Sequence, residues 1–113
     1  MECKNATISS VTIGFDRGTI PCAWVYLEYA SGGQGFGGFH LGGPVAHTFI
    51  FGILDTLGVD KWEDLKGQAC RVVGNDSGIV KIGHYLKDDW FEPKEEFKAT
   101  MNKWVDATKQ EVK

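Results

Sequence analysis

Cysteine is scarce in this sequence, and the cysteines that occur do not form a disulfide framework or a metal site. Cys3, Cys22 and Cys70 are odd in number, lie far apart and include no C-x-x-C pair. Small domains that depend on disulfides usually carry an even set of cysteines, and zinc sites place their ligands in closely spaced pairs. We therefore expect reduced thiols, two of them buried in strands.

Long apolar runs are also missing. Every apolar stretch is interrupted well short of the roughly 20 residues that a membrane-spanning helix needs. The first residues, Met1–Asn5, lack the basic start and the apolar centre of a signal peptide. These absences predict a cytoplasmic protein that makes no contact with a membrane.

Arginine is nearly absent. Arg17 and Arg71 are the only two, the lysines are spread along the chain, and the net charge is −3. A protein that binds DNA or RNA polymers needs a basic face. The acidic residues, in turn, are too sparse for the chain to imitate a nucleic acid. The charge distribution therefore argues against a nucleic-acid polymer as the partner.

What the chain does contain is the hydrophobic content of one globular domain. It has 113 residues, of which 42% are hydrophobic and 24% charged, so we expect residues 1–113 to form a single domain. Alternating apolar residues predict strands, and apolar residues spaced by three or four predict helices. The expected strands are Ala6–Phe15, Ile20–Ala30, Gly35–Leu41, Cys70–Val73 and Ile79–Leu86.

Helices are expected between and after these strands. Pro44 suits the first turn of a helix that Gly58 ends as a C-cap, and a short turn follows from Asp60, its expected N-cap, to Leu65. The fold class is therefore α+β: a small antiparallel sheet of about five strands, with a central helix and a C-terminal helix packed on it. The last helix starts at Pro93 and carries an apolar stripe of Phe97, Met101, Trp104, Val105 and Thr108.

The strand Ile20–Ala30 is apolar on both faces. Cys22, Trp24 and Tyr26 alternate with further apolar residues, so one face can enter the core while the other requires cover. Exposed aromatic surface of this kind usually marks an interface. We expect a homo-oligomer in which a second subunit supplies the cover.

One glycine-rich segment matches a dinucleotide-binding motif at Gly33, Gly35 and Gly38. In that motif a helix opens among the glycines and its N-terminus holds the pyrophosphate. Here the helix cannot begin before about Gly43. Glycines that allow close backbone approach are the better explanation.

No catalytic or metal-binding constellation is recognisable. His40, His47 and His84 show no metal-ligand spacing, and no nucleophile motif surrounds the cysteines. We therefore expect a binding protein rather than an enzyme, with no cofactor and no metal.

Binding potential is concentrated in aromatic residues and arginines, because rings stack on bases and guanidinium groups hold phosphate oxygens. His84 shares a strand face with apolar residues and is expected to be a hydrogen-bonded residue of the core or of a pocket wall. Trp90 and Phe91 have an alternative role, which is to seal the joint between the last strand and the last helix. The candidate ligand-binding residues are Arg17, Phe36, Phe39, Arg71, His84, Trp90 and Phe91.

A series of short runs between about Ala6 and Phe97 resembles a widespread group of small phage and prophage proteins. The pattern is similar to the phage anti-Thoeris sponge family, whose members sequester cyclic ADP-ribose signals and, in some cases, cyclic oligonucleotides without degrading them. His84 stands where relatives are expected to have asparagine. The runs are Gln34–Phe39, Leu57–Gly67, Arg71–Val72, Ile82–His84 and Lys87–Pro93.

The resemblance implies a phage-encoded anti-defence protein in the cytoplasm of an infected bacterium. It implies a small cyclic nucleotide as the partner and a homo-oligomer, for which a hexamer is one option, with pockets between protomers. The alternative hypothesis is a protein-binding inhibitor of a bacterial defence complex, of the anti-CRISPR type. An enzyme acting on a nucleotide ranks last because no catalytic constellation supports it.

Overall fold

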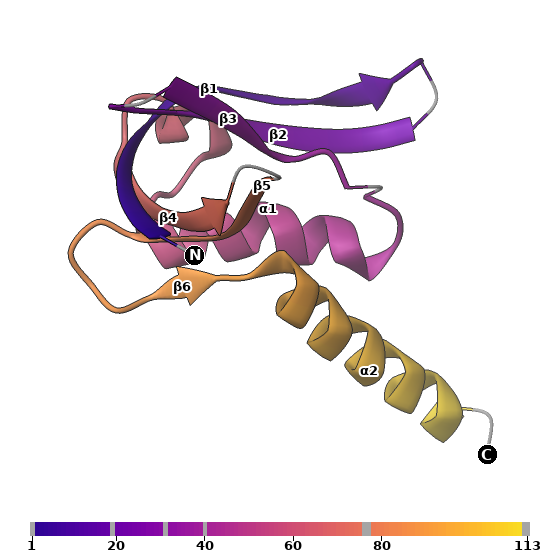
Figure 1. Ribbon diagram of the computed structural model, residues 1–113. Helices are drawn as coiled ribbons and strands as arrows, with labels where there is room; N and C mark the ends of the chain where they lie inside the picture. Colours follow the sequence, from indigo (N-terminus) through magenta and orange to yellow (C-terminus); the bar gives the residue numbers. More distant parts are fainter. Residues whose placement is uncertain (1, 19, 31, 40, 76–77, 112–113) are drawn as a thin grey trace.

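The computed structural model has six strands and two α-helices, which confirms the α+β class (Figure 1). It describes residues 2–18, 20–30, 32–39, 41–75 and 78–111, with side chains of the last helix described as far as Lys103. All neighbouring strands are antiparallel, in the order β3-β2-β1-β4-β5-β6. The elements are β1 (Glu2–Asp16), β2 (Ile20–Tyr29), β3 (Gly32–Gly37), α1 (Pro44–Leu57), the 3-10 helix η1 (Trp62–Leu65), β4 (Ala69–Asn75), β5 (Gly78–His84), β6 (Trp90–Phe91) and α2 (Pro93–Glu111).

The long strand β1 joins two halves of the sheet. Its residues from Glu2 to Thr7 pair with β4, and those from Thr7 to Asp16 pair with β2. A β-bulge between Ile8 and Ser10 follows this change of partner, and bulges bend a strand and increase its twist. β1 curves accordingly (Figure 1), and only around Thr7 does it have ladder partners on both sides.

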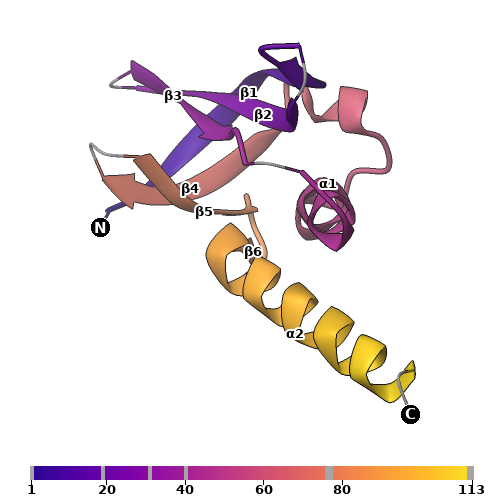
Figure 2. The ribbon, with the colours of Figure 1, turned by 90° about the vertical axis from the view of Figure 1, so that its right-hand side faces the viewer.

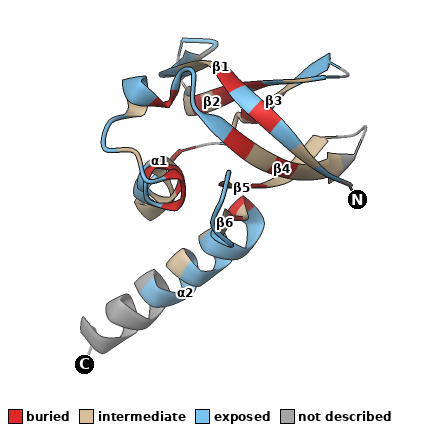
Figure 3. Ribbon diagram, turned by 90° about the vertical axis from the view of Figure 1, so that its left-hand side faces the viewer, coloured by how far each residue is buried: buried red, intermediate tan, exposed pale blue. Residues whose placement is uncertain are grey.

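The core lies between one face of the sheet and α1. Buried and exposed residues alternate along the strands (Figure 3), as expected for a sheet with one covered face. On α1 the buried side chains recur at helical spacing, at Phe49, Ile53 and Leu57 among others. The sheet contributes Ala6, Ile8, Ala23, Val25, Leu27, Phe36, Cys70, Val72, Ile82 and Phe91.

The ends of α1 fall where the sequence predicts them. Pro44 occupies the first turn, and Gly58 ends the helix with a φ of 71°, a left-handed conformation that favours glycine. The Gly58 N–H donates to the Asp55 carbonyl at 3.3 Å, and the Val59 N–H donates to the Leu54 carbonyl at 2.9 Å. These bonds satisfy carbonyls that the end of the helix would otherwise leave unpaired.

The position of α2 differs from the prediction, because this helix packs mainly on α1 rather than on the sheet (Figure 2). The Phe97 ring lies 5.2 Å from the Phe39 ring and 6.2 Å from the Phe49 ring, and the hydroxyls of Thr48 and Thr100 are 2.6 Å apart. Within the described residues, neither helix has the length and apolarity needed to cross a bilayer. The side chains of Trp104, Val105 and Thr108 in the predicted stripe lie outside the described residues.

The strand count is six rather than about five because Trp90 and Phe91 pair with β5. The sequence suggested only a joint at this point, since two residues are too short for an alternating pattern. β5 itself ends at His84 rather than at Leu86, whose side chain is exposed.

Other boundaries differ from the predicted ones as well: β1 begins at Glu2 rather than at Ala6, β3 begins at Gly32 rather than at Gly35, and β4 spans Ala69–Asn75 rather than Cys70–Val73. β3 ends at Gly37, because Gly38 has a φ of 74° that turns the chain out of the strand; His40, in the predicted extension, lies outside the described residues. The 3-10 helix begins at Trp62 with Lys61 at its N-cap position, so Asp60 is not the cap.

Candidate functional site

The face of the sheet opposite α1 is called the helix-free face below. The register of the strands determines which side chains lie on it. Residues paired directly across antiparallel strands point to the same face. Asn5 pairs with Arg71, Arg71 with Gly83, and Gly83 with Trp90. The neighbours of Arg71, Gly83 and Trp90 along their strands include core residues, so this row lies on the helix-free face.

Trp90 lies across Gly83 in this row. A Cβ built on Gly83 would come within 2.5 Å of the Trp90 ring, so only glycine leaves room for the indole in this position. Arg71 Cζ lies 4.8 Å and Lys81 Nζ 4.9 Å from the ring centroid, distances typical of cation–π contacts. The indole Nε1–H donates to Asp88 Oδ1 at 2.9 Å and thereby fixes the orientation of the ring.

The resulting Trp90 cluster (Arg71, Lys81 and Trp90) gathers two positive charges at one ring. Neither cation forms an ion pair with a carboxylate of the described residues. Like charges repel, and an anion bound between them would relieve that repulsion. The cluster therefore has the charge and the aromatic surface that suit an anionic ligand with a ring.

Arg71 also holds the loop between β5 and β6. Its Nε–H donates to the His84 carbonyl at 2.9 Å, and its Nη2 donates to the Lys87 carbonyl at 2.7 Å. The other guanidinium donors have no hydrogen-bond partner among the described residues, so they are available to a ligand.

His84 shapes the same loop from its own ring. Its Nδ1 accepts hydrogen bonds from the backbone N–H groups of Leu86 and Lys87, both at 3.0 Å. Nδ1 must be unprotonated to accept them, which places the ring hydrogen of the neutral imidazole on Nε2. The structure gives His84 a role in ordering the loop, and its contact with a ligand stays a prediction.

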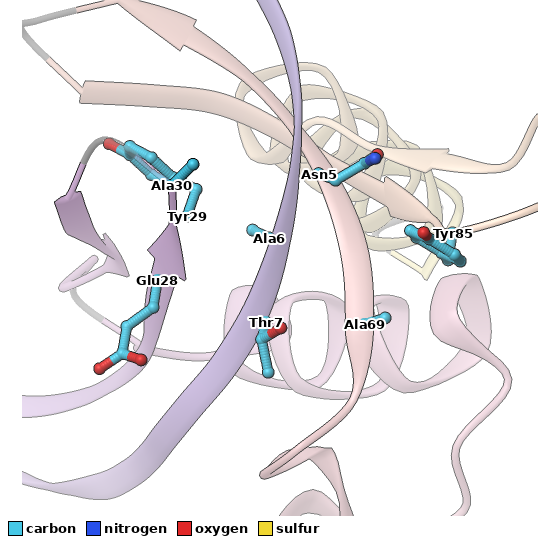
Figure 4. Close-up of a pocket in the computed structure, with 8 residues that line it drawn as sticks. All are labelled: Asn5, Ala6, Thr7, Glu28, Tyr29, Ala30, Ala69 and Tyr85. Carbon is cyan, nitrogen blue, oxygen red and sulfur yellow. The ribbon is translucent and has the colours of Figure 1, made fainter.

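A pocket of about 520 Å³ opens where β1 exchanges β4 for β2 as its neighbour (Figure 4). Thr7 pairs with Glu28 on one side and with Ala69 on the other, so these side chains are neighbours on the helix-free face. Their row adjoins the row of Asn5 and Arg71. The lining residues are Asn5, Ala6, Thr7, Glu28, Tyr29, Ala30, Ala69 and Tyr85.

A second tryptophan lies on the helix-free face, on the β2–β3 side of the pocket. The rings of Trp24 and Tyr26 are 5.9 Å apart and inclined by only 14°. A Cβ on Gly38 would come within 2.3 Å of the Trp24 ring, and one on Gly35 within 3.0 Å. These contacts confirm that the glycines of this segment permit close approach. The group that packs against Gly35 and Gly38 is the ring of Trp24.

Four of the predicted ligand-binding residues lie elsewhere. Phe36 and Phe91 are each only 2% exposed and belong to the core, so they cannot offer a stacking surface. Phe39 is 40% exposed but contacts the rings of Phe49 and Phe97 on the helix side. Arg17 lies in the turn between β1 and β2, far along β1 from the row of Arg71. Among the candidates, Arg71 and Trp90 are the ones that the structure brings together in one row; His84 pairs with the buried Cys70 and meets Arg71 through its backbone carbonyl.

Several residues of this site were not predicted from the sequence. Lys81 lies two residues before Gly83 on β5 and therefore shares its face, a signal that strand alternation already contains. Glu28, Thr7 and Asn5 carried no such signal, because they meet only through the pairing of β1 with both β2 and β4.

Cys70 is the neighbour of Arg71 on β4 and faces the core. Burial raises the pKa of the Cys70 thiol to about 12, so Cys70 is protonated near neutral pH and is a poor nucleophile. Within the described residues, no group of three or more His, Cys, Asp or Glu side chains is arranged to hold a metal ion.

Comparisons with known proteins do not assign a family. No protein-family model matches the chain, and no curated protein or solved structure gives a significant match. The geometry of the helix-free face is therefore the basis for the functional proposal.

Proposed function

We propose that the protein binds a small nucleotide on its helix-free face and holds it without cleaving it. The observation that carries this proposal is the Trp90 cluster, with Arg71 Cζ at 4.8 Å and Lys81 Nζ at 4.9 Å from one indole ring. Arginine and lysine bind phosphate, and bases stack on aromatic rings and on guanidinium planes. A nucleotide has both the phosphate and the base that these groups favour.

The setting that we propose is the one implied by the sequence resemblance. A phage-encoded protein of this kind would sequester a cyclic nucleotide immune signal of the infected bacterium, either a cyclic ADP-ribose isomer or a cyclic oligonucleotide. Sequestration requires affinity and no catalytic group. The adjoining pocket of about 520 Å³ falls in the size range of small-molecule sites, which supports a ligand of this size.

We propose further that the protein is a homo-oligomer. Tyr26 and Tyr85 are exposed on or beside the helix-free face, and Ile13 and Phe15 are 53% and 70% exposed on the β1–β2 hairpin. Exposed apolar surface of this extent favours burial against another subunit, which would also enclose a bound ligand. Light scattering at micromolar concentration tests the proposal, and a monomeric mass would contradict it.

The binding experiment is calorimetric titration with a cyclic ADP-ribose isomer and a cyclic dinucleotide. We expect saturable binding of at least one of them. The protein is then heat-denatured, and the released compound is identified by mass spectrometry. Intact ligand supports sequestration, whereas an altered ligand would identify the protein as an enzyme.

A protein-binding inhibitor is the second candidate, and the exposed Ile13 and Phe15 favour it. Both lie on the distal part of the β1–β2 hairpin, on the same strand face as Val11. An apolar pair of this kind suits a protein surface. Binding of no nucleotide, together with a defined complex that Phe15→Ser abolishes, would favour this candidate.

A further inference from the structure

We infer that β1 pairs with β1 of a second copy along its open edge, the side of Val11–Phe15 that faces away from β2, so that two sheets become one. This inference rests on the proposed homo-oligomer and names the surface through which two protomers meet. From Glu2 to Ile8 the same edge is paired with β4 and with the residues just before β4. Beyond Ile8 no described residue pairs with it, and Figure 1 shows β2 on only one side of this part of β1.

Strand geometry identifies the backbone groups on the open edge. In an antiparallel pair, successive residues direct their N–H and C=O groups alternately toward the partner strand and away from it. The carbonyls of Pro21 and Ala23 on β2 accept hydrogen bonds at 3.0 and 2.8 Å from the segment after β3, so both residues are directed away from β1. Their partners Phe15 and Ile13, and likewise Val11, are therefore directed away from β2. The N–H and C=O groups of these β1 residues have no hydrogen-bond partner among the described residues.

The open edge lacks the features that normally prevent strands from pairing with other chains. Proteins protect exposed edges with lysines, prolines, bulges or very short strands, because unpaired backbone groups attract another strand. Val11–Phe15 contains no charged residue and no proline, and the bulge of β1 lies before it. The two outermost strands are poorer templates: β6 has two residues, and β3 has four glycines among its six residues, which weakens a strand. We therefore expect the open edge to be paired in the native protein.

The open edge is complementary to itself about a two-fold axis. When Ile13 pairs with the partner's Ile13, Val11 pairs with the partner's Phe15, and every N–H and C=O group of both open edges has a hydrogen-bond partner. A shift of one strand by two residues would leave either Val11 or Phe15 without a partner. A two-fold interface uses the same surface on both subunits, so this register identifies a second copy as the occupant.

The same register covers the exposed apolar side chains of the hairpin. Val11, Ile13 and Phe15 alternate with Thr12 and Gly14, so the three apolar side chains lie on one face. In the single chain Ile13 is 53% and Phe15 70% exposed. In the symmetric pair, Ile13 lies opposite Ile13 and Phe15 opposite Val11, which forms an apolar row across the interface. One pairing thus satisfies both the free backbone groups and the exposed side chains.

The first test changes the open edge and measures the mass by sedimentation equilibrium at micromolar concentration. Ile13→Pro removes an outward N–H and no hydrogen bond between β1 and β2, a position that strands tolerate for proline. Ile13→Lys keeps the backbone and places like charges opposite each other, which disfavours pairing. We expect the unmodified protein to have at least twice the mass of either variant. Thr12→Lys is the matched control, because Thr12 is exposed on the other face; its mass should not change, and circular dichroism checks the fold of all three.

The second test measures the register by disulfide cross-linking in a protein that also carries Cys3→Ser and Cys22→Ser. Ile13→Cys should form a disulfide-linked dimer on mild oxidation, because directly paired residues have Cα atoms about 5.5 Å apart, within the range of a disulfide. Val11→Cys should not, because its two copies would lie about 13 Å apart along the paired strands. The double variant Val11→Cys and Phe15→Cys should cross-link again, since these two positions pair with each other.

The outcomes separate this inference from the proposals on which it rests. An oligomer whose mass is unchanged in Ile13→Pro and Ile13→Lys would overturn the inference and leave the homo-oligomer standing, as would equal cross-linking of Ile13→Cys and Val11→Cys. A monomeric unmodified protein would remove both. A defined complex with a different protein that Ile13→Pro abolishes would assign the open edge to that protein and overturn the pairing with a second copy. Nucleotide binding is measured separately by calorimetry, so none of these results decides it.

Discussion

The two faces of the sheet come from the same strands and differ in almost every physical property. The face under α1 is dry, with aliphatic side chains and Phe91 packed against the ring of Phe49. On the helix-free face, Trp24 and Trp90 lie across glycines. The cations Arg71 and Lys81 contact the Trp90 ring, and the pocket beside Thr7 and Glu28 opens on the same face. Aromatic residues on the face under α1 stabilise the fold, and those on the helix-free face are accessible to a ligand. The two roles therefore differ in the burial of the side chain and not in the type of residue.

The sharpest test of this contrast uses two adjacent residues. Phe91→Ala should lower the free energy of unfolding by about 3–5 kcal/mol, because its ring is buried against α1. Trp90→Ala should lower it by about 1 kcal/mol, the size of a lost cation–π contact, while weakening nucleotide binding by about 1–3 kcal/mol. Denaturant titration and calorimetry measure the two effects. Equal destabilisation by both changes would show that the faces are not distinct.

The two arginines provide the next comparison. Arg71→Ala should weaken nucleotide binding by about 1.5–3 kcal/mol, the range for a hydrogen bond to a charged group. Arg17→Ala is the control: the same residue type is removed from a turn that lies away from the site, and affinity should not change. Calorimetric titration of both variants checks this. If Arg17→Ala weakened binding as much as Arg71→Ala, the ligand would have to lie elsewhere.

A glycine substitution tests whether the position of Trp90 matters. In Gly83→Ala the new Cβ would lie within 2.5 Å of the indole, so the ring must move, and overpacking of this kind costs about 1–3 kcal/mol of stability. Binding should weaken with it. Gly14→Ala is the matched control, since Gly14 is also a strand glycine and its Cβ would meet nothing within 4 Å; its effect should stay within about 0.5 kcal/mol. Similar losses in both variants would mean that Trp90 is not held by Gly83.

The fold was largely predictable from the sequence because its signals are local. Alternation along β2 and helical spacing in α1, with Pro44 and Gly58 at its ends, predicted the element types. The position of α2 was not predictable, because an apolar stripe does not specify the surface it meets. Its first aromatic residue, Phe97, contacts rings of the segment from Phe39 to Phe49 rather than the sheet.

The site was predictable only in part. Arg71 and Trp90 were paired correctly, because a hairpin between β4 and β5 and a short return strand bring them to one row. Phe91 was assigned to the wrong face, since the sequence does not fix the register of a two-residue strand. Glu28 and Asn5 are brought together by the change of partner along β1, and no local pattern contains that information.

The smallest effect near neutral pH concerns the cysteines, which also distinguish the two faces. Cys70 is fully buried on the face under α1, whereas Cys3 is exposed. Iodoacetamide at pH 8 should modify Cys3 in the folded protein and leave Cys70 intact, because the thiolate is the reactive form and burial raises the pKa of Cys70 to about 12. Mass spectrometry of peptides checks this, and denatured protein, in which Cys70 should react, is the control.

The same raised pKa predicts a loss of stability at high pH. The Cys70 thiol has a pKa of about 12 in the folded state against 9.0 for a free thiol, so only the unfolded chain releases this proton between those values. The contribution of the buried thiol to the free energy of unfolding is fully present below pH 9. It is lost as the pH rises toward 12, by about 1.4 kcal/mol per pH unit. Lysines and tyrosines titrate in the same range, so the comparison is made with Cys70→Ala, which retains them. Denaturant titrations at pH 8 and pH 11 should give a smaller decrease in the free energy of unfolding for Cys70→Ala than for the unmodified protein. Equal decreases would place the thiol in contact with water and outside the dry face of the sheet.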